Sequence, residues 1–412
     1  MKKRIAITLI LFVLSISTIA QDDGISPELE IHLDGLEAQT EALRGLDELE
    51  NVTRLFPTRD DLLIYLDGVF ETELTQGIID EEMAFYAAFD FIDPALDLRA
   101  TLLDLYGQQI AGYYDTDTEE MNTILLTGEQ PGDALPLLER ITYVHEFVHA
   151  LQDQHFGLDA LLESTDTVNA DRTLAIISLV EGDASFVMNA YTVREAEANP
   201  LGSMLSLLAG GLQSGNLAMP PGIPAIIEAE LLFPYLTGEQ FVNAIYVDGG
   251  WDAVNALYDN PPQSSEHILH PETFLAGEMP LEVSLSVTLP DNWTLLREDV
   301  MGEFYLREYL ATQLSTPIAT AAATGWAGSA YQVYENENDD MAWILSLALD
   351  SEADTVEFVD AYTEFMSLRL PDAAMNDNCA VSTETLCMQV NNTSVLIAYA
   401  PDETLARTLL EE

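Results

Sequence analysis

Residues 141–156 read ITYVHEFVHALQDQHF, the most informative stretch of this 412-residue chain. Apolar residues in and just before it recur at steps of three and four: Leu137, Ile141, Val144, Val148 and Leu151. That spacing places them on one face of a helix packed against a core. We therefore predict a helix from Asp133 to Phe156, with Gly157 as its C-cap.

The same stretch contains an HExxH motif, in which His145, Glu146 and His149 are the defining residues. Helical residues four apart lie one turn above each other, so both imidazoles can bind one tetrahedral zinc ion. Glu146 lies further round the helix, where it can act as general base on the zinc-bound water. The competing interpretation is a surface helix with two incidental histidines. However, five of the six histidines fall into two clusters, at 145–155 and 267–270, which favours zinc.

A catalytic zinc needs a third protein ligand and one open position. We favour Glu181, in LVEGDAS on the next predicted helix, because its neighbour Gly182 lacks a side chain and would let that helix approach the metal. The competing candidate is His155, ten residues after His145 as in the metzincin pattern. That pattern has a turn-forming glycine where this chain has Gln152, so a continuous helix would point His155 away from the metal.

These motifs resemble gluzincin-type zincin metallopeptidases, and within them bacterial secreted proteins that carry HExxHALQDQ followed by EGDA. The resemblance extends to LRGL (43–46), AGYYD (111–115), LLFPYLTGEQFV (231–242), PPQSSEHILHPE (261–272) and, more loosely, GWAGSAY (325–331). It implies a zincin catalytic domain in which His145, His149 and Glu181 bind zinc. It also implies that Glu146 is the catalytic base.

The resemblance further suggests an oxyanion donor, because zincins commonly place a His or Tyr opposite the zinc. His270, in SEHILHPE, is our candidate for this catalytic role, with equal weight for a histidine that only interacts with a helix C-terminus. Tyr113 or Tyr114 could serve instead. Where such relatives tend to have a charged residue after GWAG, this chain has Ser329 and Ala330, which argues against a role for that loop.

The chain ends suggest an extracellular protein. Residues 2–4 are basic, residues 5–19 are mostly apolar and Ala20 follows, as in a Sec-type leader. We expect cleavage and secretion; the alternative is an uncleaved anchor, although the apolar run is shorter than the roughly 20 residues that a span needs. The two cysteines, Cys379 and Cys387, can close a small disulfide loop in an oxidising compartment.

The composition excludes some partners. With 71 acidic and 14 basic residues the net charge is −57, which disfavours binding to nucleic acid or to anionic lipid. The hydrophobic content of 48% is enough for a substantial core, so the chain is not a disordered acidic tail.

The expected fold class is α+β: a zincin-like, mostly helical catalytic domain with a small edge sheet, and a smaller C-terminal α+β domain. Clean alternation in LEVSLSVTL (281–289) predicts a half-buried strand, and GSMLSLLAGGLQSG (202–215) predicts a flexible connection. The expected organisation is a signal peptide (1–20), an acidic, mainly helical region (21–110), a catalytic region (111–277) and a C-terminal α+β domain (278–412).

Local patterns predict several further elements. NVTRLF (51–56) is β-like, and Thr58 with Asp61 forms a near capping box for a helix that follows. IAGYYD and MNTILL, within 110–126, predict paired strands. We also expect a strand from Ala342 to Leu349.

We therefore expect a secreted zinc metallopeptidase that acts on a polypeptide substrate, with Zn²⁺ as cofactor and no stable membrane insertion after leader cleavage. An extended substrate would pair with an edge strand formed by AGYYD or MNTILL. A rival is an extracellular binding or structural protein that keeps a zincin scaffold without turnover, and a third reading is a structural zinc with His155 as a fourth ligand. The sequence leaves open the oligomeric state and whether the acidic helices before residue 110 form a prosegment.

Overall fold

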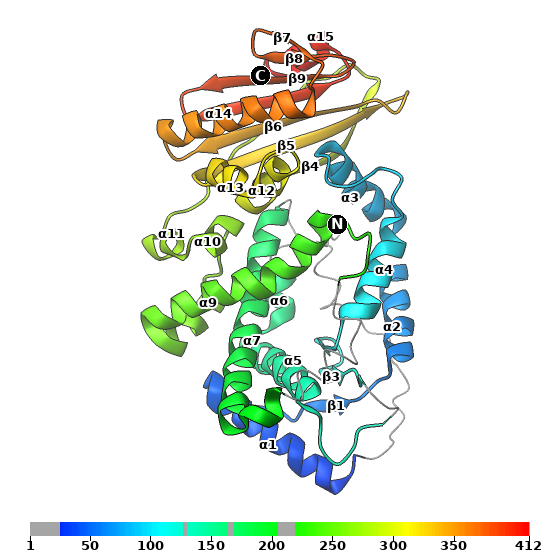
Figure 1. Ribbon diagram of the computed structural model, residues 1–412, viewed down its shortest axis with the longest axis vertical. Coiled ribbons are helices and arrows are strands. Elements are labelled where there is room, and N and C mark those ends of the chain that lie inside the picture. Colours follow the sequence, from blue (N-terminus) through cyan, green and yellow to red (C-terminus); the bar gives the residue numbers. More distant parts are fainter. Residues whose placement is uncertain (1–24, 127–129, 164–168, 205–218, 412) are drawn as a thin grey trace. The chain divides into compact units, whose positions relative to one another are not determined.

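The computed structural model describes residues 25–126, 130–163, 169–204 and 219–411 (Figure 1). The predicted leader and most of the predicted connection at 202–215 lie outside the described residues. The chain divides into two compact units. The first consists of Met1–Thr75, Asp97–Asp166 and Leu174–Pro262, and the second of Gln76–Leu96, Thr167–Thr173 and Gln263–Glu412.

The first unit is mostly helical. Its helices are α1 (Pro27–Arg44), α2 (Arg59–Thr72), α4 (Leu98–Gln109), α5 (Leu137–Phe156), α6 (Leu158–Glu163), α7 (Ala170–Ala198, whose first four residues belong to the second unit) and α9 (Ala225–Asp259). Its strands are β1 (Thr53–Leu55), β2 (Gly112–Asp115) and β3 (Glu120–Thr123). The strand order is β1-β3-β2, with β1 parallel and β2 antiparallel to the central β3. β2 is therefore an edge strand.

The predicted HExxH helix is confirmed as α5. It begins at Leu137, four residues later than expected, because Pro136 occupies the N-cap, and it ends at Phe156 before Gly157 in the left-handed conformation. Its apolar face, which includes Tyr143, Phe147 and Leu151, is fully buried against α1 and part of α7. This packing fixes α5 on one side and leaves its opposite edge for polar side chains.

Other local predictions for this unit are confirmed. β1 lies within NVTRLF, and β2 and β3 form the predicted hairpin. α2 begins with a complete capping box between Thr58 and Asp61. α7 is the one described helix long and apolar enough to cross a membrane, but 78% of that apolar window is buried inside the protein, as in a core helix.

The second unit is built on a seven-stranded sheet of order β4-β5-β6-β10-β9-β8-β7, in which each neighbouring pair is antiparallel. Its strands are β4 (Trp293–Asp299), β5 (Trp326–Asn336), β6 (Met341–Leu349), β7 (Ala374–Asn376), β8 (Cys379–Val381), β9 (Thr385–Asn391) and β10 (Ser394–Ala400). Its helices are α3 (Gln76–Ala88), α10 (Ser265–Leu269), α11 (Pro271–Ala276), α12 (Glu303–Ala311), α13 (Thr316–Ala323), α14 (Glu352–Arg369) and α15 (Glu403–Leu409). The α+β class is thus observed, and β6 matches the strand expected at 342–349.

Helix α3 packs on this second sheet, although the sequence-based division placed it in the N-terminal region. Phe85 stacks on Tyr331 of β5 at 5.2 Å between ring centroids, and Phe89 lies 4.8 Å from Trp343 of β6. Glu82 also forms an ion pair with the buried Arg297 of β4. These contacts are long-range, so local pattern alone does not reveal them.

The strand predicted for 281–289 is wrong. In the structure this segment forms no strand, and one backbone bond, from the Leu281 amide to the Ala327 carbonyl, attaches its start to β5. The predicted half-burial is nevertheless present: Leu285, Val287 and Leu289 pack on the face of the sheet opposite Trp343. The alternating pattern of apolar residues thus indicates burial on one side only. A strand has such a pattern, and so does a segment that lies across the face of a sheet.

The GWAGSAY stretch is also not a loop. It begins β5, the longest of the described strands, which the sequence analysis did not predict. Ser329 is buried there, donating to the Met301 carbonyl and accepting from the Met301 amide. The small hydroxyl side chain at this position therefore has a structural role.

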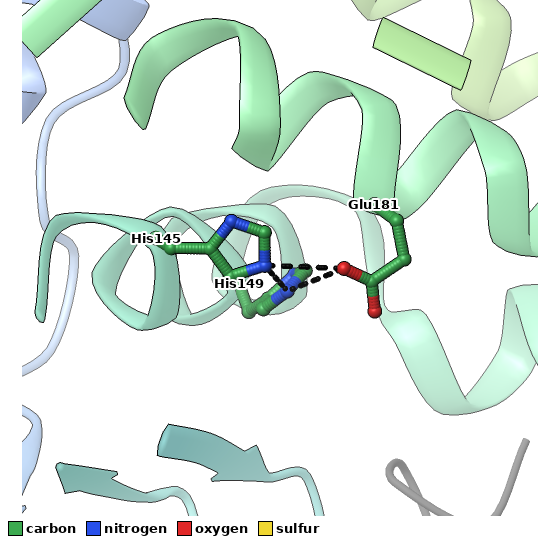
Figure 2. Close-up of side chains that lie close together, drawn as sticks. All are labelled: His145, His149 and Glu181. Carbon is green, nitrogen blue, oxygen red and sulfur yellow. Dashed lines mark hydrogen bonds and ion pairs between the residues drawn. The ribbon is translucent and has the colours of Figure 1, made fainter. Parts of the chain in front are cut away.

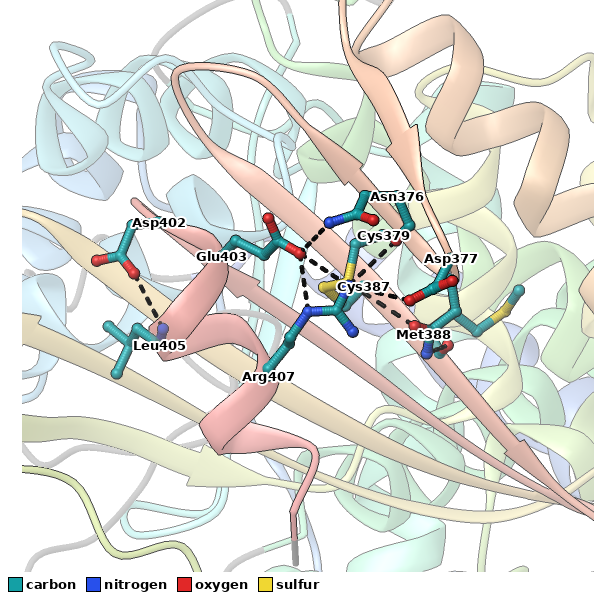
Figure 3. Close-up of a disulfide and its surroundings, with 10 residues drawn as sticks. Asn376, Asp377, Cys379, Cys387, Met388, Asp402, Glu403, Leu405 and Arg407 are labelled. Atoms are coloured by element: carbon teal, nitrogen blue, oxygen red, sulfur yellow. Dashed lines mark hydrogen bonds and ion pairs between the residues drawn. A yellow bond between two sulfur atoms is a disulfide. The ribbon is translucent and has the colours of Figure 1, made fainter.

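The two cysteines form a disulfide, which the sequence allowed but left open, at directly paired positions of β8 and β9 (Figure 3). Both are fully buried beside α15. Nearby, Arg407 of α15 pairs with Glu403 at 2.8 Å, and Glu403 accepts from Asn376 of β7. The disulfide and these polar contacts join the small β7–β8 hairpin to the rest of the sheet.

Candidate metal centre

Three of the predicted site residues converge in the first unit. His145 and His149 project from one face of α5, and Glu181 projects toward them from α7 (Figure 2). All three are buried, and they are the one group of potential metal ligands found among the described residues.

The separations between their ligand atoms fit a single zinc ion. The two Nε2 atoms lie 3.1 Å apart, and Glu181 Oε2 lies 3.1 Å from His145 Nε2 and 3.5 Å from His149 Nε2. Ligands about 2.0–2.1 Å from a tetrahedral zinc lie about 3.3 Å from one another. Two imidazoles and one carboxylate are also the donor set of many catalytic zinc sites. The residues therefore fit a zinc with an open fourth position.

The electrostatics of the group favour a bound positive charge. Burial alone would lower the pKa of His149, but the Glu181 and Glu146 carboxylates outweigh it and raise that pKa to about 9. Burial alone would raise the pKa of Glu181, but His149 and His145 outweigh it and lower that pKa to about 2. The carboxylate thus stabilises a cation in the buried site, a role that a metal ion can fill in place of a proton.

Glu146 lies beside the group without belonging to it. Burial raises its pKa above the usual value, against the attraction of His145 and His149. Gly112 of β2 lies against it: a Cβ at Gly112 would be 2.8 Å from Glu146 Cγ and 2.7 Å from Thr142 Cγ2. A glycine here lets the backbone of the edge strand run directly past the candidate base.

A cavity of about 240 Å³ opens at this point. His145, Glu146 and Tyr235 line it together with the residues that lead into β2. Five of the lining residues are apolar: Ile110 and Ala111 just before β2, and Met188, Leu231 and Leu232. The candidate base, one candidate ligand and an edge strand therefore share one apolar cleft.

Tyr235 is a site residue that the sequence analysis missed. Its ring stacks on His145 at 5.8 Å between centroids, and its hydroxyl hydrogen bonds with Glu181. Burial raises the pKa of Tyr235 well above its usual value, so the hydroxyl keeps its proton. The one available signal was its position in LLFPYLTGEQFV, a stretch already noted for its resemblance to zincin relatives.

The role we predicted for Gly182, which was to let its helix approach the metal, is wrong. Its missing side chain makes room for α9 rather than for the metal: a Cβ at Gly182 would lie 2.3 Å from the backbone of Gly238. The two glycines let α7 and α9 touch, and α9 carries Tyr235 one turn before Gly238.

The structure places the alternative residues elsewhere. His155, on the last turn of α5, hydrogen bonds through Nε2 to the Asp47 carbonyl at 2.8 Å. The Tyr114 hydroxyl donates to Asp153, and Tyr113 stacks on Tyr65. These contacts do not bring His155, Tyr113 or Tyr114 into the group of potential metal ligands.

His270 belongs to the second unit, where it caps α10 and bonds through Nε2 to Glu303 at 2.9 Å. That hydrogen bond with Glu303 raises its pKa. The contacts described for His270 all lie within this unit, so its role as oxyanion donor stays a prediction.

Comparison with known proteins gives one match. Residues 294–409 match the model of a family described as a domain of unknown function (DUF8575). No curated protein and no solved structure matches the chain. The matched stretch lies in the second unit, so the candidate metal centre falls outside it.

Proposed function

We propose that this chain is a secreted, zincin-like zinc metallopeptidase. The observation that carries the proposal is the convergence of His145, His149 and Glu181 beside a cleft whose wall contains Glu146. Structural zinc sites are closed by four protein ligands, whereas three ligands next to a cleft leave a position for water and substrate.

The residues divide the chemistry between them. When bound, zinc supplies Lewis acidity, which polarises a carbonyl and lowers the pKa of water to about 7. Glu146, which lines the cleft, accepts the proton of the attacking water and returns it to the leaving amine. The protonated Tyr235 hydroxyl, which hydrogen bonds with Glu181 in the free site, turns to donate that hydrogen bond to the developing oxyanion.

The cleft suits a polypeptide substrate. β2 is an edge strand, so an extended peptide can add to it through backbone hydrogen bonds, and of the two strands we considered only β2 has this position. The apolar lining beside Glu146 then receives a large apolar side chain next to the cleaved bond. The buried disulfide supports an oxidising, extracytoplasmic location.

The decisive experiment compares two variants of one helix. Glu146→Gln should retain zinc and lose casein hydrolysis by about 100-fold or more. Glu139→Gln is the control: Glu139 is also buried on α5, but it accepts from the Leu126 amide, and a glutamine oxygen preserves that bond. Full hydrolysis by Glu146→Gln would exclude this base. Zinc-loaded wild type that cleaves no protein substrate would instead favour a catalytically silent binding protein.

A further inference from the structure

His149 is oriented by a glutamine on its own helix. His149 Nδ1 lies 2.8 Å from Gln152 Oε1. The Gln152 amide nitrogen lies 3.0 Å from the Val180 carbonyl and 3.2 Å from Asp183 Oδ2. Gln152 and Asp183 are both fully buried, so these bonds form without competition from solvent.

These contacts determine which ring nitrogen of His149 is available to a metal. The amide nitrogen of Gln152 faces two acceptors and must be the donor, so its oxygen faces His149. An amide oxygen only accepts, so Nδ1 of His149 carries the proton. The lone pair is therefore on Nε2, the atom that faces His145 and Glu181.

Asp183 is held in turn by the N-terminal helix. Arg44, the last residue of α1, places Nε 2.8 Å from Asp183 Oδ1, and both side chains are fully buried. The Tyr258 hydroxyl donates to Asp183 at 2.7 Å. The guanidinium of Arg44 also lies over the ring of Trp251, 4.3 Å from its centroid. Unsatisfied buried charges are costly, so these partners fix the Asp183 carboxylate.

We propose that Gln152, held by Asp183 and Arg44, is a positioning residue that sets the tautomer of His149 and with it the zinc affinity. The inference rests on the proposed zinc site. The effect acts through one ligand, because Nδ1 of His145 has no hydrogen-bond partner among the described residues. It follows that α1, through Arg44, contributes to the chain of contacts that orients His149.

The first test replaces two glutamines of α5. Gln152→Leu should weaken zinc binding 10- to 100-fold in competition with a chelator, and shift the visible spectrum of the Co²⁺-substituted protein. Gln154→Leu is the control, because Gln154 bonds to the backbone at Leu49 and Glu50. It should bind zinc within about twofold of wild type. Equal zinc affinities for folded Gln152→Leu and wild type would overturn the proposal.

The second test addresses the N-terminal helix. Arg44→Met should weaken zinc binding by about 10-fold, whereas Arg54→Met should not, because Arg54 pairs with Asp34 and Glu37. If Arg44→Met does not fold, Arg44→Lys keeps the charge beside Asp183 and should show a smaller loss that still exceeds that of Arg54→Met. Unchanged zinc affinity in the folded Arg44 variant would remove α1 from the metal centre.

Zinc affinity is measured without substrate, which separates this inference from the proposed peptidase activity. A wild-type protein that binds zinc but cleaves nothing would refute the activity and leave the positioning role intact. An active protein whose Gln152→Leu variant binds zinc normally would refute the positioning role alone. A wild type that binds no zinc would refute both.

Discussion

Gly182 of α7 and Gly238 of α9 lie backbone against backbone. A Cβ at Gly182 would be 2.3 Å from the carbonyl carbon of Gly238, and a Cβ at Gly238 would be 2.2 Å from the Ser178 carbonyl oxygen. Glu181 precedes one of these glycines and Tyr235 lies one turn before the other, so the contact sets the distance between a candidate ligand and a candidate oxyanion donor.

Gly182→Ala should therefore push α9 away from α7. We expect a loss of about 1–3 kcal/mol in the free energy of unfolding from overpacking, together with weaker peptide hydrolysis as Tyr235 moves. The matched control is Gly35→Ala, an exposed position on α1 with nothing within 4 Å of the added Cβ. That change should raise the free energy of unfolding by about 0.5–1 kcal/mol, because alanine has a higher helix propensity than glycine. Denaturant unfolding measures the free energy of unfolding of both variants. Equal stability of Gly182→Ala and wild type would contradict the close contact.

Tyr235→Phe removes one hydroxyl from the cleft. If this hydroxyl stabilises the oxyanion, kcat should fall about 100- to 1000-fold while KM changes little, when the variant is assayed with excess zinc to offset its lost bond with Glu181. Tyr114→Phe serves as the comparison, since its hydroxyl donates to Asp153. It should keep most of its activity. Steady-state kinetics on a peptide substrate measure both, and a Tyr235→Phe variant as fast as Tyr114→Phe would return His270 to consideration.

The third ligand can be assigned by metal analysis. Glu181→Ala should be essentially zinc-free after dialysis, because two neutral imidazoles alone hold the ion weakly. His155→Ala should keep its zinc and lose about 1 kcal/mol of stability or less, from its bond to the Asp47 carbonyl. A zinc-free His155→Ala protein beside a zinc-loaded Glu181→Ala protein would reverse the assignment.

How much of the candidate site could be predicted depended on whether its geometry is local. His145 and His149 share a face because of helical spacing, which one motif specifies. Glu181 was selected from the residues around it and from the resemblance, and α7 does bring it to the imidazoles. Tyr235 depends on the packing of α9 against α7, which no local pattern encodes, so it was missed.

The fold shows the same division. Capping at Thr58 and the β2–β3 hairpin are short-range features and were predicted correctly. The position of α3 depends on aromatic contacts between Phe85 and Tyr331, residues far apart in the chain. In 281–289 the pattern records burial and leaves hydrogen bonding undetermined, which is why a strand was predicted where none forms.

The second unit contains a carboxyl group whose titration should be visible in its stability. Burial, together with Glu303 and Asp299, raises the pKa of Asp171 to about 7 against the opposing hydrogen bonds from Ser265. In the unfolded chain an aspartate has a pKa of about 3.9. Between these values the folded state retains a proton that the unfolded state has released. The contribution of Asp171 to stability is therefore complete below about pH 4 and is lost as pH rises toward 7, by up to about 1.4 kcal/mol per pH unit.

Asp171→Asn should remove that slope, because an uncharged amide replaces the protonated acid at every pH. The test is denaturant unfolding at several pH values between about 5 and 7, with tryptophan fluorescence as the signal that monitors unfolding. Three of the four tryptophans, Trp293, Trp326 and Trp343, belong to the second unit and report on it. Glu266, whose pKa is raised to about 8 mainly by burial, should leave a residual decline in the variant. If the variant and wild type lose stability in parallel, Asp171 is ionised in the folded protein and its buried environment must compensate the charge.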